Sequence, residues 1–208
     1  MIYPLIIPRK LYYINLFISL FLKLIMPDKS HLGQTQIFYG NGKGKTTSAL
    51  GTAIRALGSN YNVHLVQFMK NGAQDYEIEM PGEIISLSKF SNFSYKRFGA
   101  GTWIIGKPKQ EHFDAVNQAL EHLQSSLQNP NYDIIIADEI LYAVQLSLLS
   151  EDKVISLINS KPKNKELILT GSHIPFPNIF QHCDLVTEVK KIKHPYDKGI
   201  IGRKGIEY

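Results

Sequence analysis

The feature that most constrains this chain is a glycine-rich turn between a strand-like run and an amphipathic helical run. Residues 36–39 read as a buried strand. Residues 46–57 place Leu50, Ala53, Ile54 and Leu57 on one helical face, and a glycine follows them. The turn and the start of that helix read Gly40, Asn41, Gly42, Lys43, Gly44, Lys45, Thr46 and Thr47. A strand, such a turn and a helix in succession predict a site that cradles phosphate groups.

The residue types in this turn suit the phosphates of a nucleotide. Gly42 and Gly44 allow successive backbone N–H groups to turn towards phosphate oxygens. Lys45 is expected to reach the phosphates, and Thr46 to offer a hydroxyl to Mg²⁺, while the helix N-terminus adds partial positive charge. The strict pattern has glycine at the position of Tyr39, whereas here it comes one residue later, so the match is to a variant. A plain glycine-rich turn is the alternative.

A second run supplies the acids that a metal at such a site needs. Residues 132–137 predict a strand, which Asp138 and Glu139 follow directly. Because ligands of open α/β sheets bind at the carboxyl ends of the strands, we expect Thr46, Asp138 and Glu139 to hold Mg²⁺ together with phosphates and water. An acid pair that caps the next helix is the alternative.

Strand-like and helical runs alternate along the rest of the chain. Strands are predicted at 63–68, 167–169 and 185–189, with 83–87 as a weaker candidate. Helices are predicted at 110–127, 140–149 and 154–158, and residues 88–110, which show no period, are expected to be rich in loops. The alternation predicts a single-domain α/β protein of the P-loop (RecA-like) type, with a mostly parallel sheet covered by helices on both faces.

The charge of the chain does not call for a nucleic-acid partner. Of its 23 basic residues, three lie in residues 1–25, which hold no acid, so 20 basic and 18 acidic groups remain, a net charge of +2. No basic stripe marks the remainder, so no nucleic acid is expected as a partner. The single cysteine, Cys183, excludes an internal disulfide and fits a reducing compartment; it reads as a small, half-buried residue near a strand start.

Residues 1–26 form an apolar N-terminal segment, and residues 27–208 the expected domain. Residues 11–22 are nearly all apolar and follow two basic residues, as in a signal peptide, but the small residues of a cleavage site are missing. Lys23 interrupts the run before it reaches the roughly 18–20 residues of a membrane span. A true start at Met26 or a loose N-terminal helix is the favoured interpretation, and a membrane anchor is the alternative.

Further motifs follow the phosphate turn in a fixed order up to the last residue. They are Ala49-Leu50-Gly51, Ala53-Ile54-Arg55-Ala56-Leu57-Gly58, Val66-Gln67-Phe68-Met69-Lys70, Phe98-Gly99-Ala100-Gly101-Thr102-Trp103, Gly106-Lys107-Pro108, Asp138-Glu139-Ile140-Leu141-Tyr142-Ala143, Leu169-Thr170-Gly171, Asp184-Leu185-Val186-Thr187-Glu188, Lys193-His194-Pro195-Tyr196 and Gly205-Ile206-Glu207-Tyr208. Together with residues 40–47, this ordered set resembles the cob(I)alamin and cob(I)yrinic acid a,c-diamide adenosyltransferases of the bacterial cobalamin pathway. Each motif alone is weak, whereas their order is specific.

The resemblance implies a reaction and its substrates. A Co(I) corrinoid attacks C5′ of ATP and triphosphate leaves, with Lys45, Thr46 and Glu139 implied as catalytic residues. Nucleotide contacts are implied for residues 40–47 and Arg55, with Gln67 and Lys70 at the end of the second strand as further candidates. ATP is implied to bind in the reverse orientation to that of other P-loop proteins, with C5′ facing the corrinoid.

This chain departs from the family pattern at positions that are implied to contact the corrinoid. Trp103 matches an aromatic position that is implied to form an apolar wall against four-coordinate cobalt. Some relatives carry a phenylalanine two residues before it, where this chain has Gly101, and Phe98 or Phe93 is a candidate to fill the space. Ser172 stands where relatives often place an arginine after Thr-Gly.

Two other function classes stay open on the sequence: a different P-loop kinase or NTPase, and a non-catalytic ATP-dependent sensor. A reductase that supplies Co(I) and a homodimer are expected from the resemblance, and a cytoplasmic location from the need for ATP. His173 and His194, both in predicted loops, are candidates for substrate contact.

Overall fold

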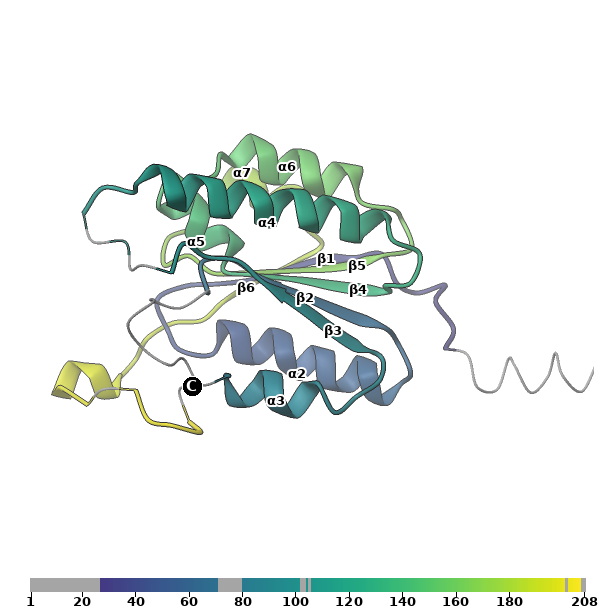
Figure 1. Cartoon of the computed structure of the whole chain (residues 1–208), viewed down its shortest axis with the longest axis horizontal. Helices are drawn as coiled ribbons and strands as arrows, with labels where there is room; N and C mark the ends of the chain where they lie inside the picture. Colours follow the sequence, from purple (N-terminus) through teal and green to yellow (C-terminus); the bar gives the residue numbers. More distant parts are fainter. Residues whose placement is uncertain (1–26, 71–79, 102–103, 105, 201, 207–208) are drawn as a thin grey trace, which may run out of the picture.

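Six strands, all parallel, form one sheet in the order β3-β2-β4-β5-β1-β6 in this computed structural model, which describes residues 27–70, 80–101, 104, 106–200 and 202–206 (Figure 1). The strands are β1 (Thr35–Tyr39), β2 (Val63–Gln67), β3 (Phe93–Arg97), β4 (Ile134–Asp138), β5 (Glu166–Thr170) and β6 (Leu185–Glu188). The predicted single-domain α/β architecture is confirmed.

Helices cover both faces of the sheet, as parallel strands require of their crossover connections (Figure 1). One face carries α2 (Lys45–Gly58) and α3 (Gly82–Leu87). The opposite face carries α4 (Gln110–Gln128), α5 (Ile140–Gln145), α6 (Glu151–Ser160) and α7 (Pro177–Phe180). A 3₁₀ turn, η1 (Pro195–Lys198), lies in the C-terminal segment.

The sheet separates two apolar cores. Successive strand residues point to opposite faces, so Ile135 of β4 packs in the core beneath α4 while Ile136 packs in the core beneath α2. Both are fully buried, as are Leu65 and Leu167 of the neighbouring strands. Burial on both faces explains why the central strands read as continuous apolar runs in the sequence.

Two predictions around the third strand were wrong. The weak strand candidate at 83–87 is helix α3, because Ile84 and Leu87, three residues apart, are the buried positions while Ile85 is half exposed. The loop expected across 88–110 contains β3, an edge strand whose residues are only partly buried. Because an edge strand lacks the apolar run that marks a central strand, residues 93–97 did not show the pattern by which the other strands were predicted.

The other predicted elements exist, with shifted ends. Helix α5 is shorter than the predicted 140–149, and α6 begins three residues before the predicted 154–158 and ends two residues after it, with Ser150 accepting a capping hydrogen bond from the Lys153 amide (3.4 Å). Residues 1–26 and Trp103 lie outside the described part of the chain. Within that part, none of the helices has the length and apolarity needed to cross a membrane.

Candidate active site

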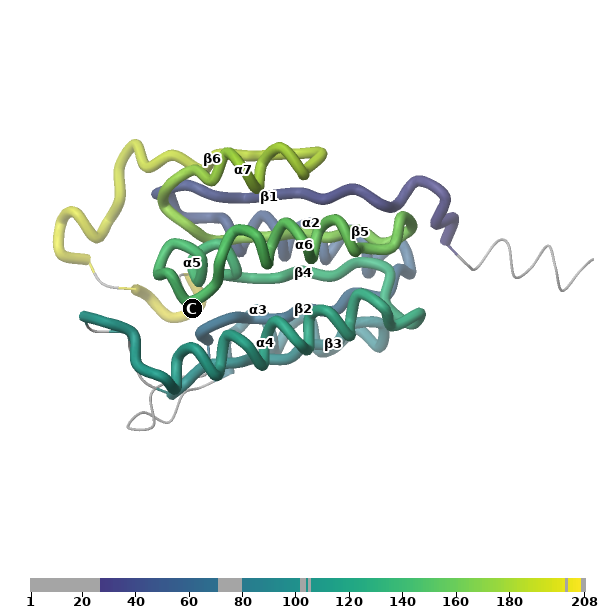
Figure 2. Tube along the Cα trace, turned by 90° about the horizontal axis from the view of Figure 1, so that it is seen from above, coloured from purple at the N-terminus to yellow at the C-terminus, as the bar shows by residue number. Residues whose placement is uncertain are grey.

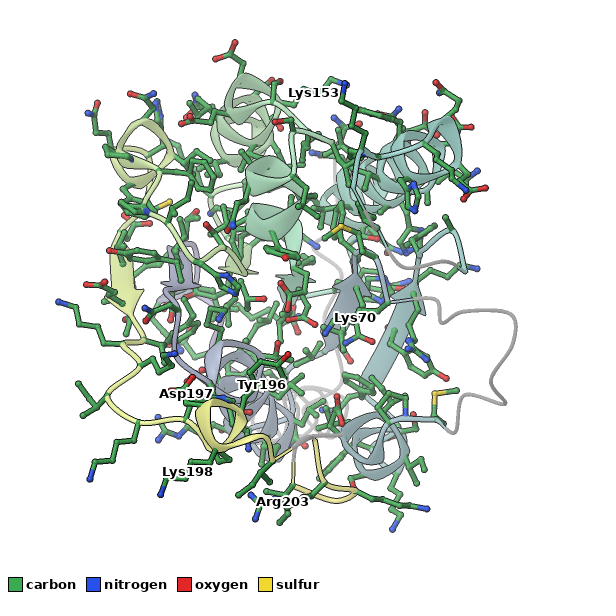
Figure 3. All side chains as sticks on the ribbon, turned by 90° about the vertical axis from the view of Figure 1, so that its left-hand side faces the viewer. Lys70, Lys153, Tyr196, Asp197, Lys198 and Arg203 are labelled. Carbon is green, nitrogen blue, oxygen red and sulfur yellow. The ribbon has the colours of Figure 1, made fainter. Side chains whose placement is uncertain are left out.

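The carboxyl ends of β1, β2, β4 and β5 meet at one edge of the sheet, which faces the viewer in Figure 3. The turn at residues 40–44 leaves β1 there and leads into α2, whose N-terminus lies at the same edge. The strand ends contribute Gln67, Asp138 and Thr170, all buried polar residues. Polar side chains are therefore collected where an open α/β sheet binds its ligands.

Asp138 is the centre of this polar group. Its Oδ1 accepts hydrogen bonds from the hydroxyls of Thr46 (2.8 Å) and Thr170 (2.6 Å), and its Oδ2 accepts one from the Gln67 amide (3.0 Å). The carboxylate is fully buried, so these three donors replace the water it lacks. The predicted approach of Thr46 to Asp138 is thus present, and Asp138 does not cap the next helix.

Lys45 folds back over the turn. Its ammonium donates to the carbonyls of Gly40 (2.8 Å) and Gly42 (3.0 Å), so the side chain closes the turn. Burial lowers the pKa of Lys45, since desolvation disfavours its charged form, while the negative charge of Glu139 opposes this effect. An anionic phosphate would stabilise the charge of this partly buried ammonium better than the two neutral carbonyls do.

Glu139 occupies a strained position beside Asp138. Its φ of 65° is left-handed, its amide donates to the Thr170 hydroxyl (3.0 Å), and its carboxylate lies 3.7 Å from the Lys70 ammonium. Gly171 packs against it so closely that a Cβ there would lie 3.1 Å from the Cα of Glu139. Burial raises the pKa of the Glu139 carboxyl, and the nearby Asp138 adds to the rise while Lys70 and Lys45 oppose it. Glu139 is the first residue before α5, but its side chain makes no capping hydrogen bond.

Two of the loop glycines face the protein rather than a ligand. The Gly40 amide donates to the Ser172 carbonyl (3.0 Å) and the Gly42 amide to the Val189 carbonyl (2.7 Å). In this structure the Gly42 N–H is therefore bonded within the protein, and its contact with phosphate stays a prediction. Gly44, with φ of 121°, directly precedes α2 and has no heavy atom within 4 Å of the position of a Cβ, so it keeps the entrance to the helix open.

The remaining predicted nucleotide contacts are spread more widely. The side chains of Asn41 and Lys43 bond the C-terminal segment, and Thr47 is exposed in the first turn of α2. Arg55 is exposed in the last turn of α2, ten residues and so about 15 Å along the helix axis from Lys45. The structure does not bring Arg55 to the phosphate turn, and Trp103 lies outside the described residues.

Thr170 was missed as a site residue, and Gln67 was considered only as a nucleotide contact. Both bond Asp138 instead. A signal existed, because each is a polar residue that ends an apolar strand. Their convergence depends on the pairing of β4 with β2 and β5, which the sequence does not state.

The candidate histidines and phenylalanines have different surroundings. His173 follows β5; its amide donates to Gln145 (2.7 Å), its ring lies 5.4 Å from that of Tyr142, and burial and the charge of Lys45 lower its pKa. His194 instead accepts from the Tyr196 amide (3.2 Å), a local capping contact. Phe98 packs on the core beneath α4. Phe93 begins β3, at the opposite end of the sheet from the site, so it does not replace the missing aromatic residue.

Comparison with known proteins agrees with this geometry. The profile of the ATP:corrinoid adenosyltransferase BtuR/CobO/CobP family matches residues 31–208. The chain belongs to this family. It is 32% identical to corrinoid adenosyltransferase CobA of Salmonella typhimurium over 83% of this chain and 84% of that protein. The corrinoid adenosyltransferase of Pseudomonas aeruginosa is 31% identical over 88% of each chain, and that of Escherichia coli K12 is 30% identical over 83% of this chain and 84% of its own.

The resemblance to corrinoid adenosyltransferases noted in the sequence is therefore confirmed. The match to the ATP:corrinoid adenosyltransferase family contains every strand of the sheet and the whole phosphate turn. A solved structure of EssC (ATPases 2 and 3) from Geobacillus thermodenitrificans overlaps 83% of this chain and 35% of its own, with 12% identity and a TM-score of 0.46, a likeness too loose to bear on function.

Proposed function

We propose that this chain is an ATP:corrinoid adenosyltransferase that moves the 5′-deoxyadenosyl group of ATP to Co(I) of a corrinoid and releases triphosphate. The observation that carries the proposal is the Lys45–Thr46–Asp138 arrangement at the carboxyl edge of the sheet, in a member of this family. The edge offers cations, hydroxyls and a helix N-terminus, which suit a polyphosphate.

The reaction is a displacement at carbon. An electron pair of Co(I) forms the Co–C bond to C5′, the C5′–O bond breaks, and its electrons stay on the oxygen of the leaving triphosphate. Negative charge therefore grows on the triphosphate in the transition state. Lys45 and the N-terminus of α2 lie where they stabilise that charge, so they act on a leaving group and not on a transferred phosphoryl group.

Mg²⁺ fits the same residues. Thr46 and Asp138 place a hydroxyl and a carboxylate oxygen 2.8 Å apart, and the buried Oε1 of Gln67 has no partner among the described residues. Mg²⁺ prefers oxygen ligands and binds proteins through one or two carboxylates plus substrate phosphates and water. We assign Thr46 and Asp138 to it, with Glu139 as the second acid; the ion supplies further charge stabilisation for the triphosphate.

Three accompanying features belong to the proposal. The resemblance implies a separate reductase, which supplies the electron that converts Co(II) to Co(I). A cytoplasmic location follows from the need for ATP. A homodimer is the proposed assembly, and light scattering of the purified protein tests it.

One assay tests the reaction against its two rivals. The protein is mixed with ATP and chemically reduced cobalamin, and both the corrinoid absorbance and the phosphate products are followed. A new Co–C bond with stoichiometric tripolyphosphate supports the transferase. ADP would identify a kinase or NTPase, and ATP binding without turnover would identify a sensor; either result overturns the proposal.

A further inference from the structure

Two described stretches of the C-terminal segment, residues 189–200 and 202–206, together form what we call the strap, which lies against the phosphate turn at both of its ends. Figure 2 shows it leaving β6 and passing through η1 beyond the carboxyl edge of the sheet, and in Figure 1 its far end lies on the side of the sheet that carries α2 and α3. At its start, the Val189 amide donates to the Tyr39 carbonyl (2.7 Å) and the Val189 carbonyl accepts from Gly42 (2.7 Å). At its far end, the Lys43 ammonium donates to the Ile206 carbonyl (3.1 Å).

The first part of the strap occupies the space in which loop side chains would otherwise stand. A Cβ on Gly40 would lie 2.4 Å from the Val189 carbonyl oxygen, and one on Gly42 would lie 2.8 Å from both that oxygen and the carbonyl carbon of Lys190. These glycines therefore allow the strap to form the outer wall of the turn. Their role differs from that of Gly44, which has open space around it.

Asn41, between these glycines, makes the side-chain contact that joins the two segments. Its Oδ1 accepts a hydrogen bond from the Lys191 amide at 2.9 Å, across 150 residues of sequence. Lys191 in turn pairs with Asp197 of η1 at 2.9 Å, so the contact continues into the turn of the strap. Figure 3 shows Asp197 and Lys198 on the side of the molecule that carries the phosphate site.

The strap is strongly basic. Its basic residues outnumber its one acid, Asp197; they are Lys190, Lys191, Lys193, Lys198, Arg203 and Lys204. Placed beside the turn, this charge suits a polyphosphate carrying several negative charges. The attraction between this charge and a phosphate in the turn weakens with distance, so it depends on whether the strap stays attached to the turn.

We propose that Asn41 is a positioning residue that fastens the basic strap to the phosphate turn, so that the triphosphate of ATP is bound between the two. The inference rests on the proposed use of ATP but not on the corrinoid step. Asn41 acts through the Lys191 amide, so removal of either partner has the same consequence. The strap loosens, ATP binds more weakly, and turnover at saturating ATP changes little.

The test compares Asn41→Ala with Lys191→Pro, which removes the donor N–H. Lys191→Ala keeps that N–H and serves as the matched control. Hydrogen exchange of strap peptides and ATP affinity by calorimetry are measured without corrinoid, and KM and kcat are measured with it. We expect Asn41→Ala and Lys191→Pro each to speed strap exchange and to weaken ATP binding about two- to tenfold, the range for one lost hydrogen bond. Lys191→Ala loses the ammonium and its pair with Asp197 but keeps the N–H, so its strap should exchange more slowly and it should bind ATP more tightly than Lys191→Pro. The effect of each change should fall on KM for ATP rather than on kcat.

The double variant makes the test decisive. Because both changes break one contact, adding Asn41→Ala to Lys191→Pro should weaken ATP binding no further. Additive losses, or weaker ATP binding in Asn41→Ala with unchanged strap exchange, would overturn the proposal and make Asn41 a direct ATP contact. If the strap results hold but no Co–C bond forms in the wild type, the reaction assignment fails and the positioning role stands.

Discussion

Asp138 receives hydrogen bonds from three side chains that are far apart in the sequence. Thr46 lies 92 residues before it, Gln67 lies 71 residues before it, and Thr170 follows it by 32. A buried carboxylate with three donors is held in one orientation, because turning it would leave a donor and an oxygen unpaired. At the scale of the residue, the Asp138 carboxylate is therefore already oriented before any ligand arrives.

Lys45→Ala should lower turnover at least about 100-fold, since removal of one donor that stabilises transition-state charge costs about that much. The ammonium of Lys45 is the loop cation closest to the turn carbonyls, so ATP affinity should fall as well. Steady-state kinetics and calorimetry measure both effects. Lys153→Ala is the control, because Lys153 is exposed on α6, away from the site (Figure 3). Equal losses in both variants would contradict the role of Lys45.

Thr46→Val should lower Mg²⁺-dependent turnover roughly tenfold or more while keeping the volume of the side chain. The lost hydrogen bond to Asp138 should cost about 0.5–1.5 kcal/mol of unfolding free energy. Thr52→Val is the matched control, since the Thr52 hydroxyl bonds only a carbonyl of its own helix (3.2 Å). Turnover and its dependence on Mg²⁺ concentration are compared, and an unchanged Mg²⁺ dependence in Thr46→Val would rule out this ligand.

At the scale of the element, glycines of this chain serve opposite purposes. Gly51 lies inside α2, and among the described residues no heavy atom from outside the neighbouring helix backbone lies within 4 Å of the position of a Cβ. Gly171, with φ of 114°, directly follows β5, and a Cβ there would lie 2.8 Å from the Tyr142 amide nitrogen. Glycine is therefore dispensable in the helix but required at the strand end, where it lets α5 approach the site.

Gly51→Ala should raise the free energy of unfolding by about 0.5–1 kcal/mol, because alanine lowers the entropy of the unfolded chain and favours the helix. Gly171→Ala should lower it by more than about 1 kcal/mol, because the left-handed φ and the Tyr142 contact both strain the new side chain. Urea denaturation measures both. If both substitutions changed the free energy of unfolding equally, the surroundings of these glycines would not determine the effect of a substitution.

At the scale of the whole molecule, a histidine pair joins β2 to α4. The Nε2 atoms of His64 and His122 lie 2.9 Å apart, and Nδ1 of His64 lies 2.8 Å from the Ser94 hydroxyl. The ring of His64 stacks on Tyr132 at 4.3 Å. Burial, together with the smaller effect of the neighbouring His122, lowers the pKa of His64 to about 4, which favours the neutral form. The pKa of His122 is lowered by burial and by the charge of Lys96.

This pair should make stability depend on pH. Because the folded pKa of His64 is below its unfolded value of about 6.5, its contribution is complete above pH 6.5 and is lost as pH falls towards 4. The loss should approach about 3 kcal/mol, which urea denaturation at successive pH values measures. His64→Phe keeps an aromatic ring on Tyr132 without a titrating group, so its profile should be flatter between pH 6.5 and 4. If the wild type and His64→Phe lost stability in parallel between pH 6.5 and 4, the titration of His64 would not be the cause of the loss.

The local sequence determined much of this protein. The glycine-rich turn, the helix after it and the apolar run that ends in Asp138 were predicted correctly, because turn chemistry and hydrophobic period are properties of neighbouring residues. The edge strand β3 escaped prediction, since an edge position is defined by what lies beside it. The helix α3 was misread, since two adjacent isoleucines fit a strand as well as a helix.

Tertiary structure alone decided which residues meet. The sheet order placed Gln67, Asp138 and Thr170 at one edge, and the pairing of β6 with β1 brought the strap to the phosphate turn. For that reason Asn41 and two glycines of the turn contact the C-terminal segment, although their spacing in the sequence suggested phosphate contacts alone. Contacts across 100 or more residues depend on how strands are ordered in the sheet, and a local pattern carries no record of that order.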